Sequence, residues 1–154
     1  MKKFILDLIV KENEHINENY FVLKLTSKNK LPDILPGQFV EIKVENSPTT
    51  FLRRPISVNF YDKKLNELWL LIQIVGDGTR KLSEVQTGDT LNLILPLGNT
   101  FSIPKDKNAR LLLIGGGVGF APMLFLGAYL NDLGYNCDFL LGGRSEANMV
   151  QLNE

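Results

Sequence analysis

A glycine-rich stretch has the residue types and spacing of a phosphate-binding turn. It runs from Leu111 to Met123 and reads LLLIGGGVGFAPM. The aliphatic run predicts a buried strand, the glycines permit a sharp turn close to a ligand, and Pro122 suits the first turn of a helix. A helix N-terminus presents unpaired N–H groups that favour an anion. The spacing is G-G-G-x-G-x-x-P rather than G-x-G-x-x-G, so a connection that binds nothing remains the alternative.

A pair of arginines is the second feature with a chemical meaning. Arg53 and Arg54 stand directly before Pro55 in residues 51–58, which read FLRRPISV. Pro55 keeps Arg54 extended and cannot donate to a strand ladder, which predicts an edge or bulged strand. Because arginine makes bidentate contacts with phosphate, the pair is a candidate anion site. Surface arginines close to carboxylates are the alternative.

A second glycine turn precedes a short predicted helix. Gly76-Asp77-Gly78-Thr79 ends a long apolar strand, and residues 80–85 are expected to form the helix with Thr79 as its N-cap. The N-terminus of that helix is a second candidate phosphate site.

The remaining reactive side chains indicate no catalytic or metal centre. His15 lies in the polar run KENEHINEN, residues 11–19, which predicts a solvated loop. Cys137 is the only cysteine, which excludes a disulfide framework or a four-cysteine cluster in this chain. We expect it to be a buried thiol in a reducing, cytoplasmic compartment. No triad or carboxylate pair stands out, so we assign no catalytic residue and no metal ligand.

Charge and hydropathy exclude two classes of partner. The chain has 154 residues, with 17 Lys plus Arg and 17 Asp plus Glu, so no net basic field attracts nucleic acid. No apolar run is long enough to span a bilayer. The N-terminus faintly resembles a signal peptide, but Asp7 interrupts its apolar run, and we expect a first strand instead.

The first two thirds of the chain have the pattern of an antiparallel barrel. Six strands are predicted, over Phe4–Val10, Tyr20–Thr26, Phe39–Val44, Phe51–Val58, Glu67–Val75 and Thr90–Leu95. Residues 61–66 are expected to form a hairpin connection, and Trp69 to serve packing.

After a charged segment at residues 104–108 the pattern changes. A strand (Leu111–Ile114), a helix (Pro122–Leu133) and a strand (Cys137–Leu141) form one βαβ unit. A parallel sheet of two strands is not a stable domain, so the chain looks truncated. The expected fold class is β plus α/β: a six-stranded antiparallel Greek-key barrel over residues 1–103, then the start of a parallel nucleotide-binding domain over residues 109–154.

Four ordered motifs together resemble the ferredoxin reductase superfamily. They are Arg54-Pro55-Ile56-Ser57, Gly76-x-Gly78-Thr79, Pro96-Leu97-Gly98-Asn99-x-Phe101 and Gly115-Gly116-Gly117-Val118-Gly119-x-x-Pro122. Within that superfamily the chain is most similar to the electron-transfer subunits of B-type dihydroorotate dehydrogenases. The resemblance covers the chain from near Met1 to its end.

The resemblance implies an FAD site on the barrel. Arg54 would pair with the FAD diphosphate, and Ser57 would lie near flavin N5. Gln73 stands where relatives often have arginine, which places one phosphate or ribose contact in doubt. The complete set of implied FAD residues is Arg54, Pro55, Ile56, Ser57, Leu71, Ile72, Gln73, Gly78 and Thr79.

The resemblance also implies an NAD(H) site on the βαβ unit. Residues facing the nicotinamide and its diphosphate would be Gly115, Gly116, Gly117, Gly119 and Pro122, and Arg144 would meet the adenosine end. NAD rather than NADP is implied by the resemblance alone. The chemistry is hydride delivery to the flavin, which requires positioning and exclusion of water but no acid, base or nucleophile.

Further expectations concern the longer protein. The resemblance implies a [2Fe–2S] cluster on four cysteines that follow the end of this chain. It also implies a heterotetramer with an FMN-containing dihydroorotate dehydrogenase catalytic subunit in pyrimidine biosynthesis. The 154 residues alone would then bind FAD but oxidise NADH poorly. The alternatives are a reductase subunit serving another acceptor, of the sulfide dehydrogenase or ferredoxin:NADP reductase type, and a non-catalytic barrel that binds a partner protein.

Overall fold

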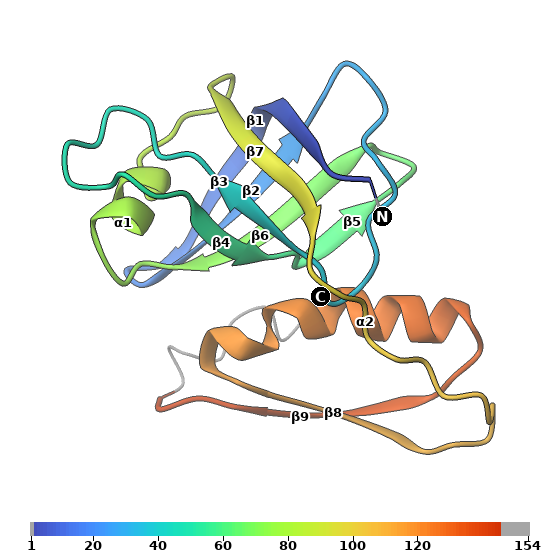
Figure 1. The fold of residues 1–154 in the computed structure, drawn as a ribbon. Helices are drawn as coiled ribbons and strands as arrows, with labels where there is room; N and C mark the ends of the chain where they lie inside the picture. Colours follow the sequence, from blue (N-terminus) through green and yellow to red (C-terminus); the bar gives the residue numbers. More distant parts are fainter. Residues whose placement is uncertain (1, 146–154) are drawn as a thin grey trace.

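The molecule consists of a barrel and a small two-stranded sheet, with one helix packed between them. The computed structural model describes residues 2–145. The elements are β1 (Phe4–Asn17), β2 (Tyr20–Thr26), β3 (Phe39–Ile42), β4 (Arg54–Ser57), β5 (Phe60–Asp62), β6 (Glu67–Gln73), α1 (Asp77–Ser83), β7 (Thr90–Leu97), β8 (Leu111–Gly116), the 3-10 turn η1 (Gly117–Phe120), α2 (Ala121–Asp132) and β9 (Cys137–Gly142). Helix α2 lies between the barrel and the β8–β9 sheet (Figure 1).

The barrel is one curled antiparallel sheet of seven strands. Its order is β4-β3-β7-β1-β2-β6-β5, so its two edge strands are consecutive in the chain. The link between them closes the curl, because the Val58 N–H donates to the Gln38 carbonyl and the Asn59 N–H donates to the Trp69 carbonyl, both at 3.0 Å. The expected antiparallel barrel is confirmed. The seventh strand is β5, which lies at the start of the expected hairpin connection and pairs with β6.

Strand β1 is longer than the sequence predicts. It continues to Asn17, so the polar run around His15 is strand and the prediction of a loop was wrong. Pairing with β2 extends this far because the register places His15 opposite Phe21, and the two rings stack at 5.7 Å. His15 Nε2 also lies 2.8 Å from the Ser83 carbonyl oxygen, which connects this strand to α1.

Helix α1 begins three residues earlier than predicted. Its N-cap is Gly76, and Thr79 occupies the third helical position, so the prediction of Thr79 as N-cap was wrong. The Thr79 hydroxyl reaches back, accepts from the Gly76 N–H at 3.2 Å and donates to the Gly76 carbonyl at 3.0 Å. A side chain that satisfies the backbone from inside the first turn allows glycine to be the cap.

Two hydrophobic clusters fill the molecule. The barrel interior contains completely buried aliphatic residues such as Leu23, Leu70 and Leu93. The second cluster lies between the outer face of β2 and β6, which supplies Val22 and Leu71, and the apolar side chains of α2. Helix α2 is apolar on most of its surface because the barrel covers one side and the β8–β9 sheet covers another. Strands β8 and β9 pair in parallel, as predicted.

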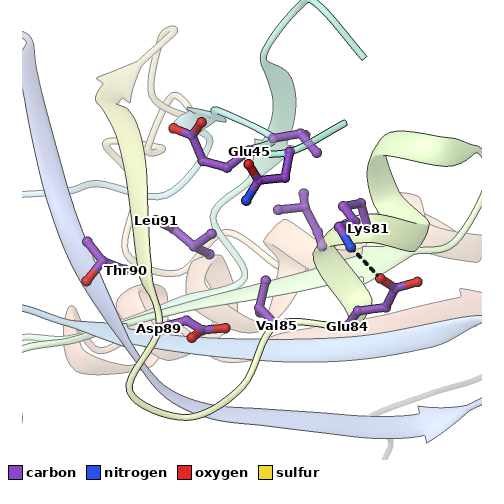
Figure 2. Close-up of a pocket in the computed structure, with 10 residues that line it drawn as sticks. Glu45, Lys81, Glu84, Val85, Asp89, Thr90 and Leu91 are labelled. Carbon is purple, nitrogen blue, oxygen red and sulfur yellow. Dashed lines mark hydrogen bonds and ion pairs between the residues drawn. The ribbon is translucent and has the colours of Figure 1, made fainter. Parts of the chain in front are cut away.

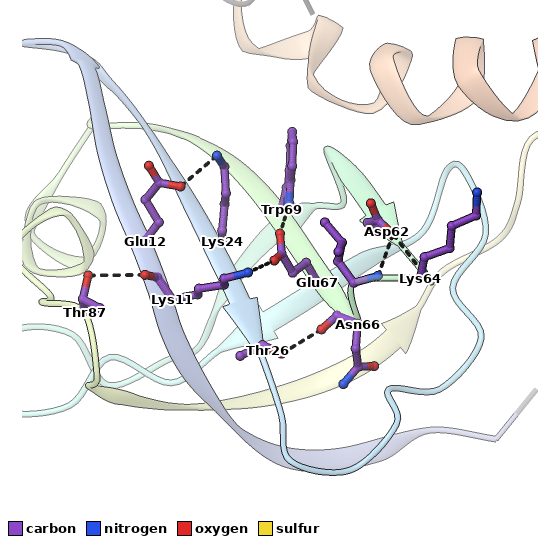
Figure 3. A network of polar contacts seen from close by, with 11 residues as sticks. Lys11, Glu12, Lys24, Thr26, Asp62, Lys64, Asn66, Glu67, Trp69 and Thr87 are labelled. Atoms are coloured by element: carbon purple, nitrogen blue, oxygen red, sulfur yellow. Dashed lines mark hydrogen bonds and ion pairs between the residues drawn. The ribbon is translucent and has the colours of Figure 1, made fainter.

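A polar network covers the outer face of β1, β2 and β6 (Figure 3). Glu67 forms an ion pair with Lys11 and accepts a hydrogen bond from Trp69 Nε1 at 3.2 Å. Lys24 pairs with Glu12 at 2.8 Å and lies 4.6 Å from the centre of the Trp69 ring. These contacts connect three neighbouring strands at their solvent face. Among residues 2–145, no helix has the length and apolarity needed to cross a bilayer.

Candidate functional site

A cavity of about 380 Å³ lies where the barrel meets the start of α2. Its lining comes from β4, from the end of β6 and the turn into α1, and from η1 with the first residue of α2. The lining residues are Arg54, Pro55, Ile56, Ser57, Leu71, Ile72, Gln73, Val75, Thr79, Val118, Gly119 and Ala121. The structure therefore brings together all the residues for which the sequence predicts FAD contacts except Gly78. Gly78 adjoins the cavity, since a Cβ built on it would lie 3.0 Å from Arg54 Cδ.

Strand β4 is an edge strand of the sheet, and all four of its residues line the cavity. It pairs on one side with β3, where Pro55 lies opposite Glu41 and no ladder donor is required of the proline. Pro55 and Ser57 are exposed, and Arg54 and Ile56 are half-buried. The predicted edge strand is confirmed.

The two arginines have different surroundings. Arg53 donates to the Asn92 carbonyl at 2.9 Å and also to the Asn92 side-chain oxygen, so it joins the loop before β4 to β7. Arg54 donates from Nε to the Arg53 carbonyl at 3.1 Å. Within residues 2–145 its two terminal nitrogens have no hydrogen-bond partner, and neither arginine forms an ion pair. Arg54 is thus the arginine with donors available to an anion.

The turn into α1 contributes backbone rather than side-chain groups. Thr79 Oγ1 accepts from the Val75 N–H at 2.9 Å in addition to its two bonds with Gly76. Its hydroxyl is therefore fully used within the turn. The absence of a side chain on Gly78 leaves room for Arg54 and for Thr50, whose Cγ2 would lie 3.1 Å from a Cβ there.

The end of the glycine-rich stretch forms the opposite wall, through Val118, Gly119 and Ala121. Gly115, Gly116, Gly117 and Pro122 are not among the lining residues. Gly115 packs directly against Phe120, because a Cβ on Gly115 would lie 2.4 Å from Phe120 Cβ. Gly117 has a positive φ of +54°. The contact with Phe120 leaves no room for a side chain at Gly115, and the positive φ favours glycine at Gly117. Gly119 lines the cavity, whereas Gly116 lies in β8 opposite Gly142. Pro122 is in the first turn of α2, as the sequence predicts.

Arg144 lies apart from these residues. It follows β9, is exposed, and is not among the cavity's lining residues. Conversely, three lining residues escaped the sequence analysis, namely Val75, Val118 and Ala121. Val75 directly precedes the Gly76 motif, whereas Val118 and Ala121 lie within the glycine-rich motif that ends at Pro122, so membership of or proximity to these motifs was the available signal.

The chemistry of the lining fits a flat apolar ring attached to an anionic group. Arg54 is the single formally charged residue in the described lining, and no carboxylate is present there. Pro55, Ile56 and Leu71 offer apolar surface, and the Arg54 guanidinium offers donors at the edge. A flavin bearing a diphosphate has this combination of features, so the residues present fit FAD.

Two other cavities have different chemistry. One of about 400 Å³ has a rim of charged residues, where Lys81 and Glu84 pair at 2.9 Å (Figure 2). Another of about 510 Å³, between the barrel and α2, is lined by aromatic rings including Trp69 and Phe139, together with Cys137. Burial, with a smaller effect of Asp138, raises the pKa of the Cys137 thiol. In the part of the chain that the structure describes, no group of His, Cys, Asp and Glu is placed to hold a metal ion.

The sequence of residues 6–101 matches the family described as the oxidoreductase FAD-binding domain. The dihydroorotate dehydrogenase B (NAD(+)) electron transfer subunit of Listeria innocua is 43% identical over 117 residues, covering 74% of this chain and 45% of the relative. Its counterpart from Listeria monocytogenes serotype 4b is 39% identical over 142 residues, covering 90% of this chain and 54% of the relative. The chain spans about half the length of the curated relatives it matches.

Solved structures show the same architecture. An NADH-dependent reduced ferredoxin-NADP oxidoreductase, described in a study of flavin-based electron bifurcation, superposes with a TM-score of 0.81 at 27% identity, covering 95% of this chain and 51% of its own. Phthalate dioxygenase reductase superposes with a TM-score of 0.78 at 23% identity, covering 94% and 46%, which shows the fold. The match over residues 6–101 shows that the chain belongs to the family of FAD-binding oxidoreductase domains, ferredoxin reductase-like in fold.

Proposed function

We propose that the chain is the FAD-binding part of an electron-transfer subunit that passes electrons from NADH, through FAD, to a dihydroorotate dehydrogenase catalytic subunit in pyrimidine biosynthesis. The observation that carries this proposal is the cavity in which the Arg54–Ser57 strand faces the glycine-rich turn. The names of the relatives from Listeria support a dihydroorotate dehydrogenase catalytic subunit as the acceptor.

The positions of the side chains around the cavity support the proposed FAD roles. Arg54 would bind the diphosphate with its terminal guanidinium nitrogens, next to backbone groups of Gly78 and Thr79. Pro55, Ile56 and Ser57 would line the isoalloxazine ring. The C-terminal end of β6, at Leu71, Ile72 and Gln73, would form the floor beside the ring. When bound, FAD supplies the reactivity toward hydride, and the chain supplies binding and orientation.

The nicotinamide would approach from the opposite wall. Gly115, Gly116, Gly117, Gly119 and Pro122 are proposed to face the nicotinamide and its diphosphate, with Arg144 at the adenosine end. Holding two rings face to face and excluding water can contribute much of the rate without an acid or base. This is consistent with a lining in which Arg54 is the sole charged group described.

The remaining parts of the proposal concern the longer protein. They are a [2Fe–2S] cluster bound outside these 154 residues, a heterotetramer with an FMN-containing catalytic subunit, NAD rather than NADP as donor, and a cytoplasmic location. The relatives' names, which specify NAD(+) and an electron transfer subunit, support the donor and the partner.

A reductase serving another acceptor is the second candidate. The similarity to an NADH-dependent reduced ferredoxin-NADP oxidoreductase, at 27% identity, favours it. The two candidates share the FAD cavity and differ in the protein that accepts the electrons.

The first experiment is the visible absorption spectrum of the purified chain, with chromatography of any cofactor that denaturation releases. We expect a flavin spectrum and released FAD. A colourless chain that also fails to bind added FAD would contradict the proposal and favour a partner-binding barrel. Co-purification with the catalytic subunit of a relative from Listeria, against ferredoxin as the competitor, then separates the two candidates.

A further inference from the structure

We propose that Asn59 is a positioning residue that holds the start of α2, and with it the wall formed by η1, at a set distance from the FAD-binding strands. The inference rests on the proposed function for the meaning of the cavity. Its structural part concerns residues of this chain only and can be tested without a cofactor.

Asn59 is completely buried where the barrel closes. It follows Ser57 by two residues, in the link between β4 and β5. Its N–H donates to the Trp69 carbonyl of β6 at 3.0 Å. This bond connects the residue to the barrel through the strand that also supplies the cavity's floor.

Two other groups of Asn59 bond to α2. Its side-chain Nδ2 donates to the Ala121 carbonyl at 2.8 Å, and its own carbonyl accepts from the Phe125 N–H at 3.1 Å. Ala121 and Phe125 are four residues apart, so they stand one above the other across the first turn of the helix. One barrel residue therefore forms hydrogen bonds at both ends of the first turn of α2.

Hydrogen bonds at these two places define the position of α2 in a way that the apolar contacts do not. Phe125 also packs its ring edge-on to Phe60 at 5.8 Å, and Leu126 is buried in the cluster beneath α2. Apolar burial is non-directional and tolerates small shifts, whereas a hydrogen bond weakens steeply as its angle changes. Asn59 thus selects one placement of the helix among those that the apolar contacts permit.

The hydrogen bond between Asn59 and Ala121 also affects the cavity. Ala121, which receives the Asn59 bond, is itself a lining residue, and Val118 and Gly119 precede it within η1. Ser57, two residues before Asn59, lines the facing wall. The two walls are therefore linked, because Ser57 precedes Asn59 by two residues in the chain and Asn59 is hydrogen-bonded to Ala121. A shift of α2 would change the gap in which a flavin and a nicotinamide must lie face to face.

Amide hydrogen exchange in the 154-residue chain tests the structural part. The Asn59→Ala change removes the side-chain donor and keeps the backbone carbonyl that accepts from Phe125, so the Phe125 amide reports whether the helix moves. Loss of a buried hydrogen bond predicts about a tenfold faster exchange at Phe125 relative to barrel amides such as Leu23 and Leu70. The Asn59→Ser variant, which retains a hydroxyl, serves if the alanine variant does not fold.

Gln38→Ala is the matched control. Gln38 is also completely buried and its side chain accepts from the Leu35 N–H at 2.8 Å, inside the barrel. We expect this variant to lower the melting temperature. The ratio of the exchange rate at the Phe125 amide to the rates at the barrel amides should stay unchanged. If both variants accelerate exchange at Phe125 only as much as at the barrel amides, Asn59 has no specific effect on the position of α2 and the inference is wrong.

Iodide quenching of bound FAD fluorescence tests the link to the cavity. Asn59→Ala should make bound flavin more accessible to iodide than either the original chain or Gln38→Ala does. Equal accessibility in all three would overturn the positioning role even if exchange at Phe125 increases. An original chain that binds no FAD would contradict the proposed function, and the exchange ratio would still decide the placement of α2 by Asn59.

Discussion

Arg53 and Arg54 are adjacent in the sequence, yet the hydrogen-bond partners of their guanidinium groups differ. Arg53 binds backbone and side-chain oxygens of Asn92 in β7, whereas Arg54 lines the cavity and, within residues 2–145, its terminal nitrogens have no hydrogen-bond partner. Arg53 lies in the loop before β4, where Asn92 is within reach, and Arg54 is the first residue of the strand that lines the cavity, so one arginine supports the barrel and the other remains available. This difference yields a prediction with an internal control.

Arg54→Ala should weaken FAD binding by about 1.5–3 kcal/mol, or roughly ten- to 150-fold in Kd, because a charge-assisted contact with the diphosphate is lost. Arg53→Ala should instead lower the melting temperature, since it removes hydrogen bonds between the loop and β7, with a smaller effect on the Kd for FAD. Titration of each apoprotein with FAD measures the first effect, and thermal unfolding measures the second. Unchanged FAD affinity in Arg54→Ala would remove Arg54 from the site.

Gly115 and Gly116 form a second informative pair. A Cβ on Gly115 would lie 2.4 Å from Phe120 Cβ and 2.6 Å from Phe120 Cα, so backbone would have to move. A Cβ on Gly116 would have the Gly142 carbonyl oxygen as its nearest neighbour, at 4.0 Å, and Gly116 has an ordinary extended φ of −121°. We expect Gly115→Ala to destabilise the chain by about 1–3 kcal/mol and Gly116→Ala to leave stability nearly unchanged.

Urea denaturation of the two variants checks this expectation. Equal losses of stability in both would indicate that the turn, rather than the contact with Phe120, sets the requirement for glycine.

Strands β1 and β6, which are not neighbours in the sheet order, are connected across β2 by the ion pair of Lys11 with Glu67. Glu67 is 3% exposed, so its carboxylate depends on its partners for stabilisation. The hydrogen bond from Lys11 lowers the pKa of Glu67, with help from Trp69 and against the opposing effect of burial. The folded state therefore favours the charged form of this side chain.

A pH dependence follows from that direction. Since the pKa of Glu67 is lower in the folded chain, its contribution to stability is present above the ordinary glutamate pKa of about 4.3 and disappears as the pH falls through the lower folded value. The original chain should lose free energy of unfolding more steeply between neutral and acid pH than Glu67→Gln does. Urea denaturation at a series of pH values measures the difference. Parallel losses in the two proteins would show that Glu67 contributes nothing to the acid sensitivity.

The barrel and the βαβ unit differ in how complete their cores are. Every buried residue of the barrel's interior cluster except Phe125 lies between Leu8 and Leu95. The second cluster instead needs both parts, because Val22 and Leu71 of the barrel pack against Leu126 and Leu130 of α2. The barrel thus has a core of its own, while α2 depends on the barrel for burial.

A shortened chain tests this division and the predicted domain limits. Residues 1–103 alone should fold cooperatively, with reduced stability, because their interior is complete and only the outer face of β2 and β6 loses its cover. FAD should bind more weakly to this chain than to residues 1–154, because Val118, Gly119 and Ala121 no longer form the second wall. Circular dichroism and FAD titration measure the two effects. Equal FAD affinity in the two chains would mean that the barrel alone provides the site.

Local patterns in the sequence were sufficient to identify most elements and the motifs of the site. Alternating residues predicted β2 at its observed bounds, Pro55 predicted an edge strand, and the change of pattern after residue 103 predicted the parallel unit. These features depend on neighbours only a few positions apart, so the periodicity of side chains and the chemistry of Gly and Pro are enough to specify them. The same motifs, read as a resemblance, indicated FAD.

Contacts between distant segments required the tertiary structure. The end of β1 contacts α1 through His15 and Ser83, which lie 68 positions apart in the chain, and the different roles of Arg53 and Arg54 depend on where Asn92 lies. The closure of the barrel joins Val58 to Gln38, and its link to α2 joins Asn59 to Ala121, which lie 62 positions apart in the chain. Such pairings leave no trace in local spacing, because the free energy that selects them comes from burial and hydrogen bonds formed only once the chain has folded.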